Sequence, residues 1–304
     1  MKKLLLIDGN AIFHRAFHAL PLLTDAKGNY TNAIYGFTKM LFEILKIEKP
    51  DYLAIAFDHR DKTFRHHEFT EYKATRSAPP PELYPQLPAL LELLAIFDIP
   101  LFQQSGFEAD DIIGTLSRQA DESPDLRTAI LTGDKDAFQL VDDHTCVIVP
   151  QKGMSETTTY DPPEVERKMG LRPDQIVDYK ALRGDASDNI PGVKGIGDKQ
   201  AVEMLQKYGN LDNLYKHLEE LKPAQRQKLA EHRETAYMSQ KMATIIRDMP
   251  IALDLEKCKL HTWPMERAKE ALTELGFKTL LKNLGELSLL FQTRQQQERQ
   301  PSLF

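Results

Sequence analysis

The sequence predicts a mostly parallel α/β sheet flanked by helices, followed by a helical domain. Short apolar runs typical of buried strands alternate with helical patterns in the first half of the chain, as they do in parallel α/β proteins. The strand-like runs are 3–7, 52–57, 99–103, 128–131 and 146–149, and helical patterns occupy 32–46, 87–97 and 109–121. After about residue 173, helical patterns dominate. We therefore expect an α/β domain over 1–165 and a helical domain over 166–290.

The composition is that of an ordinary globular protein, with 41% hydrophobic and 28% charged residues among 304. No apolar run approaches the length of a membrane span. The two cysteines lack metal-site spacing, which favours a reducing cytoplasm over a secreted, disulfide-bonded protein. The net charge of -6 argues against a nucleic-acid partner, unless acidic side chains that hold metal ions bias that sum.

Acidic residues gather at five places, and three of these places have the same form. Asp8, Asp58 and Asp134 each stand where a short apolar run ends. Because functional residues of open α/β sheets gather outside the carboxyl ends of the strands, we expect these three side chains to meet at one rim. With their neighbours they form a set of nine acids: Asp8, Asp58, Glu108, Asp110, Asp111, Asp134, Asp136, Asp185 and Asp188.

So many carboxylates in one cleft need a strong counter-charge. Two like charges about 4 Å apart repel by roughly 4 kcal/mol at an effective dielectric near 20. Mg2+ prefers oxygen ligands, and two such ions about 4 Å apart can stabilise both the attacking and the leaving oxygen of a phosphoryl displacement. Helix capping is an alternative for any single acidic cluster. It does not explain why the clusters recur at strand ends.

The segment 59–88 departs from the α/β rhythm, because basic and aromatic residues are interleaved in it. Cations that follow phosphates and rings that stack on bases suit single-stranded nucleic acid. Phe69 and Tyr72 are the aromatic candidates, and Lys73 and Arg76 follow them closely. A solvated loop or a surface helix of mixed charge fits the pattern equally well, since acidic residues also occur here.

A glycine-rich stretch at 190–201 precedes a helical pattern at 201–208. Gly192, Gly195 and Gly197 predict a tight hairpin, and a helix N-terminus that follows glycines presents backbone N–H groups to an anion. Lys199 lies near that N-terminus, where the helix dipole disfavours a cation unless an anion is bound. Lys194 adds a second positive charge in the hairpin. A purely structural αα-hairpin remains the alternative.

Five stretches of the chain carry a family signature: 8–9 (Asp-Gly), 57–58 (Phe-Asp), 108–111 (Glu-Ala-Asp-Asp), 132–136 (Thr-Gly-Asp-Lys-Asp) and 184–192 (Gly-Asp-Ala-Ser-Asp-Asn-Ile-Pro-Gly). Together they resemble the motifs of the 5′ nuclease (flap endonuclease) superfamily, and most closely those of the N-terminal 5′–3′ exonuclease domains of bacterial DNA polymerases I. The resemblance covers about residues 3–285. It implies a PIN-like α/β domain and a helix–three-turn–helix domain that binds duplex DNA.

The resemblance implies a structure-specific 5′–3′ exonuclease and flap endonuclease that hydrolyses phosphodiesters by a two-metal mechanism. Its substrates would be DNA with a 5′ flap, nick or gap, with RNA-primed 5′ ends as a further substrate. Its processes would be primer removal in replication and DNA repair. Two Mg2+ or Mn2+ ions are implied as cofactors. We expect a monomer in the bacterial cytoplasm, associated with the nucleoid and without membrane contact.

The resemblance also implies roles for individual residues. Asp8, Asp58, Glu108, Asp110 and Asp111 match the acids of the first metal, and Asp134, Asp136, Asp185 and Asp188 match those of the second. Lys73 and Arg76 match a basic pair at the base of a helical arch, assigned here to 59–88, and Arg15 matches an arginine near the active site. The hairpin 192–199 matches one that grips the duplex and can hold a K+ ion. The expected DNA contacts are Phe69, Tyr72, Gly192, Lys194, Gly195, Gly197 and Lys199.

Two rival functions stay open from the sequence. One is a non-catalytic module that binds DNA structures and uses metal only for docking. The other is a PIN-type ribonuclease, whose smaller acid set and missing duplex-binding hairpin fit this chain less well. Cleavage of a 5′-flap DNA separates the first rival, and comparison with an RNA flap addresses the second.

The C-terminal segment 291–304 is polar and rich in Gln and Arg, which predicts a disordered tail. It ends in an apolar pair, Leu303 and Phe304, and such pairs are uncommon on flexible tails unless they dock on a partner. With Gln300 they resemble the motif by which bacterial replication proteins bind the sliding clamp. The alternative is a linker with a chance match.

Overall fold

The structure is a computed structural model that describes residues 1–151, 156–261 and 263–299, with side chains through Phe291. The predicted clamp residues Gln300, Leu303 and Phe304 lie outside the described residues. Within the described part, no helix is both long and apolar enough to cross a membrane.

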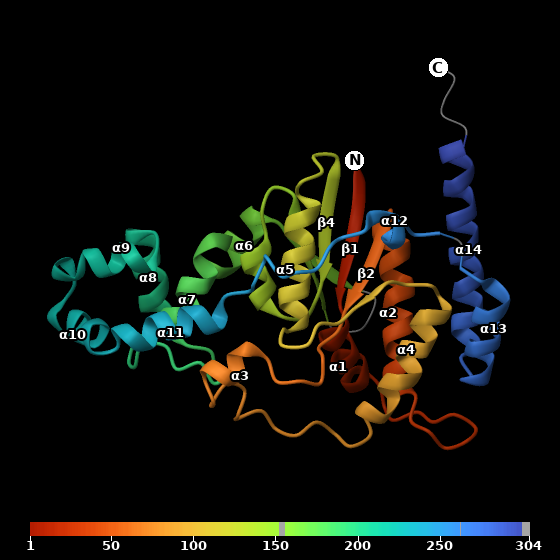
Figure 1. Ribbon diagram of the computed structural model, residues 1–304, viewed down its shortest axis with the longest axis horizontal. Coiled ribbons are helices and arrows are strands. Elements are labelled where there is room, and N and C mark those ends of the chain that lie inside the picture. Colours follow the sequence, from red (N-terminus) through yellow and green to blue (C-terminus); the bar gives the residue numbers. More distant parts are fainter. Residues whose placement is uncertain (152–155, 262, 300–304) are drawn as a thin grey trace.

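A six-stranded sheet forms the centre of the molecule (Figure 1). Its order is β3-β2-β1-β4-β5-β6, and every pairing is parallel except that of β5 with β6. The strands are β1 (Lys2–Asp8), β2 (Tyr52–Ala56), β3 (Leu101–Phe102), β4 (Leu126–Leu131), β5 (Thr145–Pro150) and β6 (Thr157–Tyr160). The predicted parallel sheet is confirmed. The edge strand β6 was missed because its threonines are partly exposed and give no apolar run.

Side chains on the two faces of the sheet pack into two separate hydrophobic cores, because successive side chains of a strand point to opposite faces. Leu4 and Leu6 point into one core, and Leu5 and Ile7 into the other. The first core is covered by α5 (Ala109–Ala120). The helices of the second are α1 (Gly9–Ala19), α2 (Asn32–Glu48) and α4 (Leu87–Ile96). Burial on both faces explains why these strands are almost continuously apolar.

The segment predicted as a helical arch contains little helix. Between β2 and α4 the chain forms α3 (Phe64–Glu68), a series of turns, and the short 3-10 helix η1 (Tyr84–Gln86). Prolines at 79–81 cannot continue a helix, since each lacks a backbone N–H. This segment passes in front of the strand ends and brings its basic residues to the acids described below.

The second half of the chain is helical, as predicted, and shares the first core with the sheet. Its elements are α6 (Pro162–Met169), η3 (Pro173–Gln175), α7 (Ile176–Arg183), α8 (Asp198–Tyr208), α9 (Leu211–Lys216), η4 (Leu218–Glu220), α10 (Pro223–Glu231) and α11 (Arg233–Ala243). The 3-10 helix η2 (Lys135–Leu140) lies between β4 and β5 and packs against this half. Gly192 turns the predicted hairpin with φ +61°, and a Cβ at this position would lie 2.2 Å from the Gly184 nitrogen.

The C-terminal helices do not belong to the helical half. After α12 (Leu255–Cys258), which packs beside β2, α13 (Met265–Glu274) and α14 (Lys278–Arg299) cover α2 and α4 on the opposite side of the sheet (Figure 1). Trp263 anchors this return by stacking on Phe97, with ring centroids 4.5 Å apart. Residues 263–291 therefore extend the α/β layer, although we expected them in a helical domain ending at 290.

The structure also corrects the expected tail. The backbone of α14 is helical through Arg299, where disorder was predicted from 291. Gln, Arg and Glu are good helix formers, and no Gly or Pro interrupts 292–299. Low hydrophobicity alone was therefore a poor guide to the state of this segment.

Candidate active site

Three strand-end acids meet at one rim of the sheet, as the sequence predicts. Asp8 ends β1, and Asp58 and Asp134 follow β2 and β4 within three residues. All three line a cleft of about 900 Å3. Glu108 and Asp110, at the start of α5, line the same cleft. The parallel arrangement of the strands is what brings together acids that are more than 120 positions apart in sequence.

Local hydrogen bonds fix the strand-end acids in place. Asp8 caps α1 by accepting the Ala11 N–H at 2.9 Å, and its other oxygen accepts the Thr132 hydroxyl at 2.7 Å. Asp134 caps η2 by accepting the Asp136 N–H at 2.9 Å. The capping interpretation is therefore correct for these two residues. It does not exclude a second role, because each carboxylate has lone pairs left for another ligand.

The first turn of α5 is joined to the strand ends by its backbone. The Ala109 N–H donates to Asp58 at 2.8 Å, and the Asp58 N–H donates to the side chain of Asn10 at 2.8 Å. Glu108 is the N-cap of α5 and is paired with Asp111 in a capping box. The start of this helix is thus held beside the ends of β1 and β2, which places Asp110 among the acids.

Burial and mutual repulsion raise the pKa of several carboxyl groups in this cluster. The pKa of Asp8 is raised to about 7, mainly by burial and further by the charges of Asp58 and Asp134. Burial and the charge of Asp8 raise the pKa of Asp110 well above its ordinary value. The pKa of Asp136 is also raised to about 7, first by burial and then by Asp134. These are the shifts expected where a cation would relieve repulsion.

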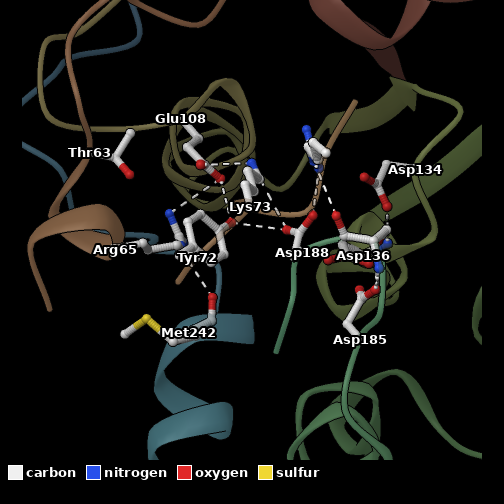
Figure 2. A network of polar contacts seen from close by, with 12 residues as sticks. Thr63, Arg65, Tyr72, Lys73, Glu108, Asp134, Asp136, Asp185, Asp188 and Met242 are labelled. Atoms are coloured by element: carbon white, nitrogen blue, oxygen red, sulfur yellow. Dashed lines mark hydrogen bonds and ion pairs between the residues drawn. The ribbon is translucent and has the colours of Figure 1, made fainter. Parts of the chain in front are cut away.

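Two basic residues of the segment 59–88, Lys73 and Arg76, line the cleft and pair with acids. Figure 2 shows Lys73 beside Glu108 and Asp188. The Lys73 ammonium lies 2.8 Å from Glu108 and 4.0 Å from Asp188, and an Arg76 guanidinium nitrogen lies 2.5 Å from Asp188. Burial alone would lower the pKa of Lys73, but Glu108 and Asp188 outweigh it and the pKa is raised. The placement of Lys73 and Arg76 beside the acids agrees with the resemblance.

Sequence reasoning missed Lys180, which lies in the last turns of α7. Its ammonium pairs with Asp136 and lies 2.5 Å from Asp185. Burial raises the pKa of Asp185, but the charge of Lys180 and the hydrogen bonds from Lys180 and Ser187 together lower it to about 2. A signal was present in the sequence, since α7 leads directly into Asp185 and puts Lys180 five positions before it.

The donor set fits hard divalent cations. The acids offer carboxylate oxygens, which are the ligands that Mg2+ and Mn2+ prefer. Among the residues that the structure describes, no three acids, histidines or cysteines converge closely enough to be a ready-made ion site. The ammonium of Lys73, the guanidinium of Arg76 and the ammonium of Lys180 instead draw four of the acids into ion pairs: Glu108, Asp188, Asp136 and Asp185.

Asp111 does not face the cleft. Its side chain has no exposed surface, and both its oxygens pair with the guanidinium of Arg65, at 2.7 and 2.8 Å. Successive residues of a helix point about 100° apart, so the helix that turns Asp110 toward the cleft turns Asp111 away from it. This placement removes Asp111 from the predicted ligands of the first metal.

Three further predicted contacts do not line the cleft. Tyr72 is 3% exposed, and its hydroxyl lies 3.1 Å from Glu108 and 3.0 Å from Asp188, so its ring is not available to stack on a base. Phe69 is half-buried beside it in a small apolar cluster. Arg15 donates to the Gln151 carbonyl after β5. Basic and aromatic interleaving could not reveal that these rings face inward.

Both lysines of the hairpin lie at the surface, whereas Gly192 is buried against Gly184. Lys194 is exposed, and the Lys199 side chain is 89% exposed at the start of α8. Gly197 is the N-cap of that helix. The Lys228 ammonium donates to the Gly195 carbonyl at 2.9 Å, so a cationic group already contacts the hairpin backbone. A DNA contact and a K+ ion at this hairpin stay predictions.

Comparison with known families decides where this fold belongs. The 5'-3' exonuclease N-terminal, resolvase-like domain matches residues 3–170, and the 5'-3' exonuclease C-terminal SAM fold matches residues 171–266. The chain belongs to the 5′–3′ exonuclease family. The acidic cleft therefore lies at the strand ends of the resolvase-like domain, and the hairpin lies in the SAM fold.

Curated relatives of this 5′–3′ exonuclease family member are bacterial DNA polymerases I. The DNA polymerase I of Bacillus caldotenax is 45% identical over 284 residues, which cover 93% of this chain and 32% of the relative. That of Bacillus subtilis is 43% identical over 286 residues, covering 94% and 32%. The chain thus spans about a third of the length of these relatives.

Solved structures share the fold of this family member at low sequence identity. The bacteriophage T5 D15 protein, co-crystallized with metal ions, has a TM-score of 0.66 at 18% identity, with 94% of this chain and 100% of that chain covered. The catalytic core of Rad2 in complex with DNA substrate has a TM-score of 0.61 at 17% identity, covering 94% and 92%. These similarities concern the fold.

Proposed function

We propose that the chain is a divalent-metal-dependent, structure-specific 5′ nuclease that cuts DNA at the junction of a 5′ single strand and a duplex. The observation that carries this proposal is the meeting of Asp8, Asp58 and Asp134 with the first turn of α5 in one cleft, beside Lys73 and Arg76. Membership of the 5′–3′ exonuclease family supports it. The T5 flap endonuclease, a structural neighbour, forms a complex with DNA and metal ions.

Two groups of acids would hold two metal ions. The first group is Asp8, Asp58, Glu108 and Asp110, and the second is Asp134, Asp136, Asp185 and Asp188. Bound Mg2+ or Mn2+ would supply a water of lowered pKa and a counter-charge for the phosphate and the leaving oxygen. The chain's own contribution is to hold Asp8 and Asp134 in place through their caps.

Lys73 and Arg76 would act on the reacting phosphate. Both residues line the same cleft as the acids, so a phosphodiester bound there would lie within reach of their cationic groups. Positive charge held there in advance stabilises negative charge that develops on phosphate oxygens. In this structure the same two groups pair with Glu108 and Asp188.

The helical half would position the substrate. The hairpin at 192–199 exposes Lys194, Lys199 and the N-terminus of α8, a combination that suits duplex phosphates. We infer that the duplex lies on this hairpin while the 5′ strand leads to the acidic cleft. Flapped, nicked and gapped DNA, including RNA-primed 5′ ends, are the proposed substrates, and primer removal and repair the proposed processes.

Cleavage-site mapping tests this function. Nicked, gapped and 5′-flapped duplexes, labelled at the 5′ or 3′ end, are incubated with the protein in Mg2+ and in EDTA. We expect Mg2+-dependent cuts at or within one nucleotide of the junction, and none in EDTA. Binding of flapped DNA without any cut in Mg2+ or Mn2+ would favour the non-catalytic module, and preference for an RNA flap on duplex would favour the ribonuclease.

We also propose that the terminal motif around Leu303 and Phe304 binds a bacterial sliding clamp. On this proposal the two apolar side chains fill a pocket of the clamp, and the tether raises the effective concentration of the nuclease at DNA. Titration of clamp with the intact protein and with a Leu303→Ala/Phe304→Ala variant tests it. Equal binding by both proteins, or no binding by the intact one, would reject it.

A further inference from the structure

Arg65 is a buried arginine in a segment predicted to face nucleic acid. Arg65 is 2% exposed, and its guanidinium is paired with groups of the protein itself. Nη1 and Nη2 form a two-pronged ion pair with Asp111, and Nη2 also donates to the Thr244 carbonyl at 2.7 Å. Nε donates to the Met242 carbonyl at 3.0 Å (Figure 2). Arg65 cannot contact DNA in this position.

Asp111 is occupied just as completely. Besides the guanidinium, it accepts the N–H of Glu108 at 3.1 Å and the N–H of Ile246 at 2.8 Å. A buried carboxylate with four donors is held in one orientation. Because Asp111 immediately follows Asp110 and lies three residues after Glu108, its orientation fixes the helical turn that carries both cleft acids.

The pair joins three parts of the chain that are distant in sequence. Arg65 belongs to α3 at the base of the segment 59–88, Asp111 to α5, and the carbonyls at 242 and 244 to the end of α11 and the chain that follows. Gly114 allows this close approach, since a Cβ there would lie 2.6 Å from Ile245 and 3.1 Å from the Ile246 carbonyl. The helical half is thus attached to α5 one turn from Glu108.

A buried ion pair between these two groups would by itself add little to the stability of the fold. Taking two charges out of water costs about as much as their attraction returns, and apolar replacements of similar volume often leave stability unchanged. What a two-pronged arginine–carboxylate pair supplies is a fixed geometry. Here that geometry is applied to the first turn of α5, next to the acids.

We propose that Arg65 and Asp111 are a positioning pair, which holds Glu108 and Asp110 in the orientation that metal binding requires. Because the pair also contacts the chain at 242–246, this orientation depends on how the helical half packs against α5. Outer residues that orient metal ligands commonly change metal affinity or activity by about 10- to 100-fold when they are replaced. The rate part of this inference rests on the proposed nuclease function. The metal-binding part does not.

Two variants of the pair and one matched control variant test this proposal. Asp111→Asn removes the charge, and Arg65→Lys keeps the charge but loses the two-pronged geometry. Gln119→Ala is the control, because Gln119 also ties α5 to the returning chain, through the Ile251 carbonyl and the Leu253 N–H, but more than two turns from Glu108. Each protein is titrated with Mn2+ while free Mn2+ is followed by electron paramagnetic resonance, and unfolding is followed by circular dichroism.

We expect Asp111→Asn and Arg65→Lys to raise the half-saturating Mn2+ concentration about tenfold or more, with Gln119→Ala close to wild type. Single-turnover cleavage of a 5′ flap should slow in the same two variants and recover in part at high Mg2+. Duplex binding in EDTA should stay unchanged. Mn2+ binding equal to that of the control would overturn the positioning role.

If Asp111→Asn fails to fold, Asp111→Glu decides the matter. It keeps the charge and moves the carboxylate by one methylene, so weakened Mn2+ binding with a normal unfolding transition supports positioning, and unaltered binding rejects it. If wild type binds Mn2+ but cuts no DNA, the proposed nuclease function fails while the Mn2+ comparison still judges the pair.

Discussion

The ammonium nitrogen of Lys180 lies 2.5 Å from a carboxylate oxygen of Asp185, and the same ammonium pairs with Asp136. Both acids belong to the group that we propose for the second metal. The Lys180 side chain is only 10% exposed, so its charge acts on the acids with little screening by water. Without metal, this lysine supplies the positive charge that the acids require.

Replacing Lys180 should therefore make the protein depend on metal for stability. In Lys180→Met the two acids lose their cation, and we expect the free energy of unfolding in EDTA to fall by about 3 kcal/mol. Mg2+ should restore more stability to this variant than to wild type. Thermal unfolding with EDTA and with Mg2+ measures both effects.

Lys3→Met is the matched control for that change. Lys3 pairs with Glu48 at 2.7 Å, with its side chain 37% exposed and the pair outside the lining of the acidic cleft. Its loss should cost little, as for most exposed ion pairs, and should leave the Mg2+ response unchanged. An equal Mg2+ response in Lys180→Met and wild type would show that Lys180 does not substitute for a metal charge.

The stability of the metal-free protein should fall as the pH rises from about 4 to about 7. Asp8 and Asp136 each have a pKa raised to about 7, against an ordinary value of 3.8. Between those values the folded protein keeps protons that the unfolded chain has released, so each step up in pH favours unfolding. Above pH 7 this loss is complete. Asp185, with its pKa lowered to about 2, has the opposite effect but only at more acidic pH.

Urea unfolding in EDTA between pH 5 and 8 checks this trend. Burial lowers the pKa of His14, so this residue makes stability rise with pH. The contribution of Asp8 is therefore measured by comparing wild type with an Asp8 variant. We expect Asp8→Asn to flatten the decline, because it removes one of the retained protons. Mg2+ should stabilise wild type more at pH 8 than at pH 5.5, since protons compete for the same oxygens. Identical profiles for Asp8→Asn and wild type would contradict the assignment.

Lys73→Ala and Arg76→Ala should slow cleavage far more than they weaken binding. Both groups stand beside the acids rather than on the duplex-binding hairpin. Removing one group that stabilises transition-state charge typically costs about 100-fold in rate or more. Single-turnover rates on a 5′ flap, with affinities measured in Ca2+, separate the two effects.

Lys194→Ala and Lys199→Ala should show the reverse pattern. Each exposed lysine that contacts a phosphate should weaken duplex binding and reduce the log–log salt slope by about one unit. Lys207→Ala is the control, because Lys207 lies in the last turn of the same helix α8 and pairs with Glu220 at 3.0 Å. If the variants of Lys73 and Arg76 and those of Lys194 and Lys199 change cleavage rate and DNA affinity alike, the two pairs do not have separate roles.

The sheet and its acidic rim could be predicted because both depend on local patterns. Buried strands of a parallel sheet are apolar runs, and Asp8 and Asp58 mark their ends. The parallel topology then brings these ends together without any knowledge of side-chain packing. The edge strand β6 gave no such signal, since its threonines are neither continuously apolar nor alternating.

The sequence could not predict which charged residues face each other. Asp110 and Asp111 are adjacent and chemically alike, yet one lines the cleft and the other is buried against Arg65. Their difference comes from the rotation of α5 and from the chain that returns at 242–246, which is a long-range contact. For the same reason Tyr72 was predicted to contact nucleic acid although it is buried, as is Arg65 in the same segment.

The most direct measurement of whether the acidic cleft is a nuclease centre is single-turnover cleavage of a 5′-flap duplex by wild type and by Asp110→Asn. This change is nearly isosteric and removes one carboxylate that lines the cleft. We predict that wild type in Mg2+ releases the flap by a cut at the junction, and that Asp110→Asn binds the same DNA but cuts it only at background rate. Cleavage by Asp110→Asn at the wild-type rate and position would contradict the proposal that these acids form the reaction centre.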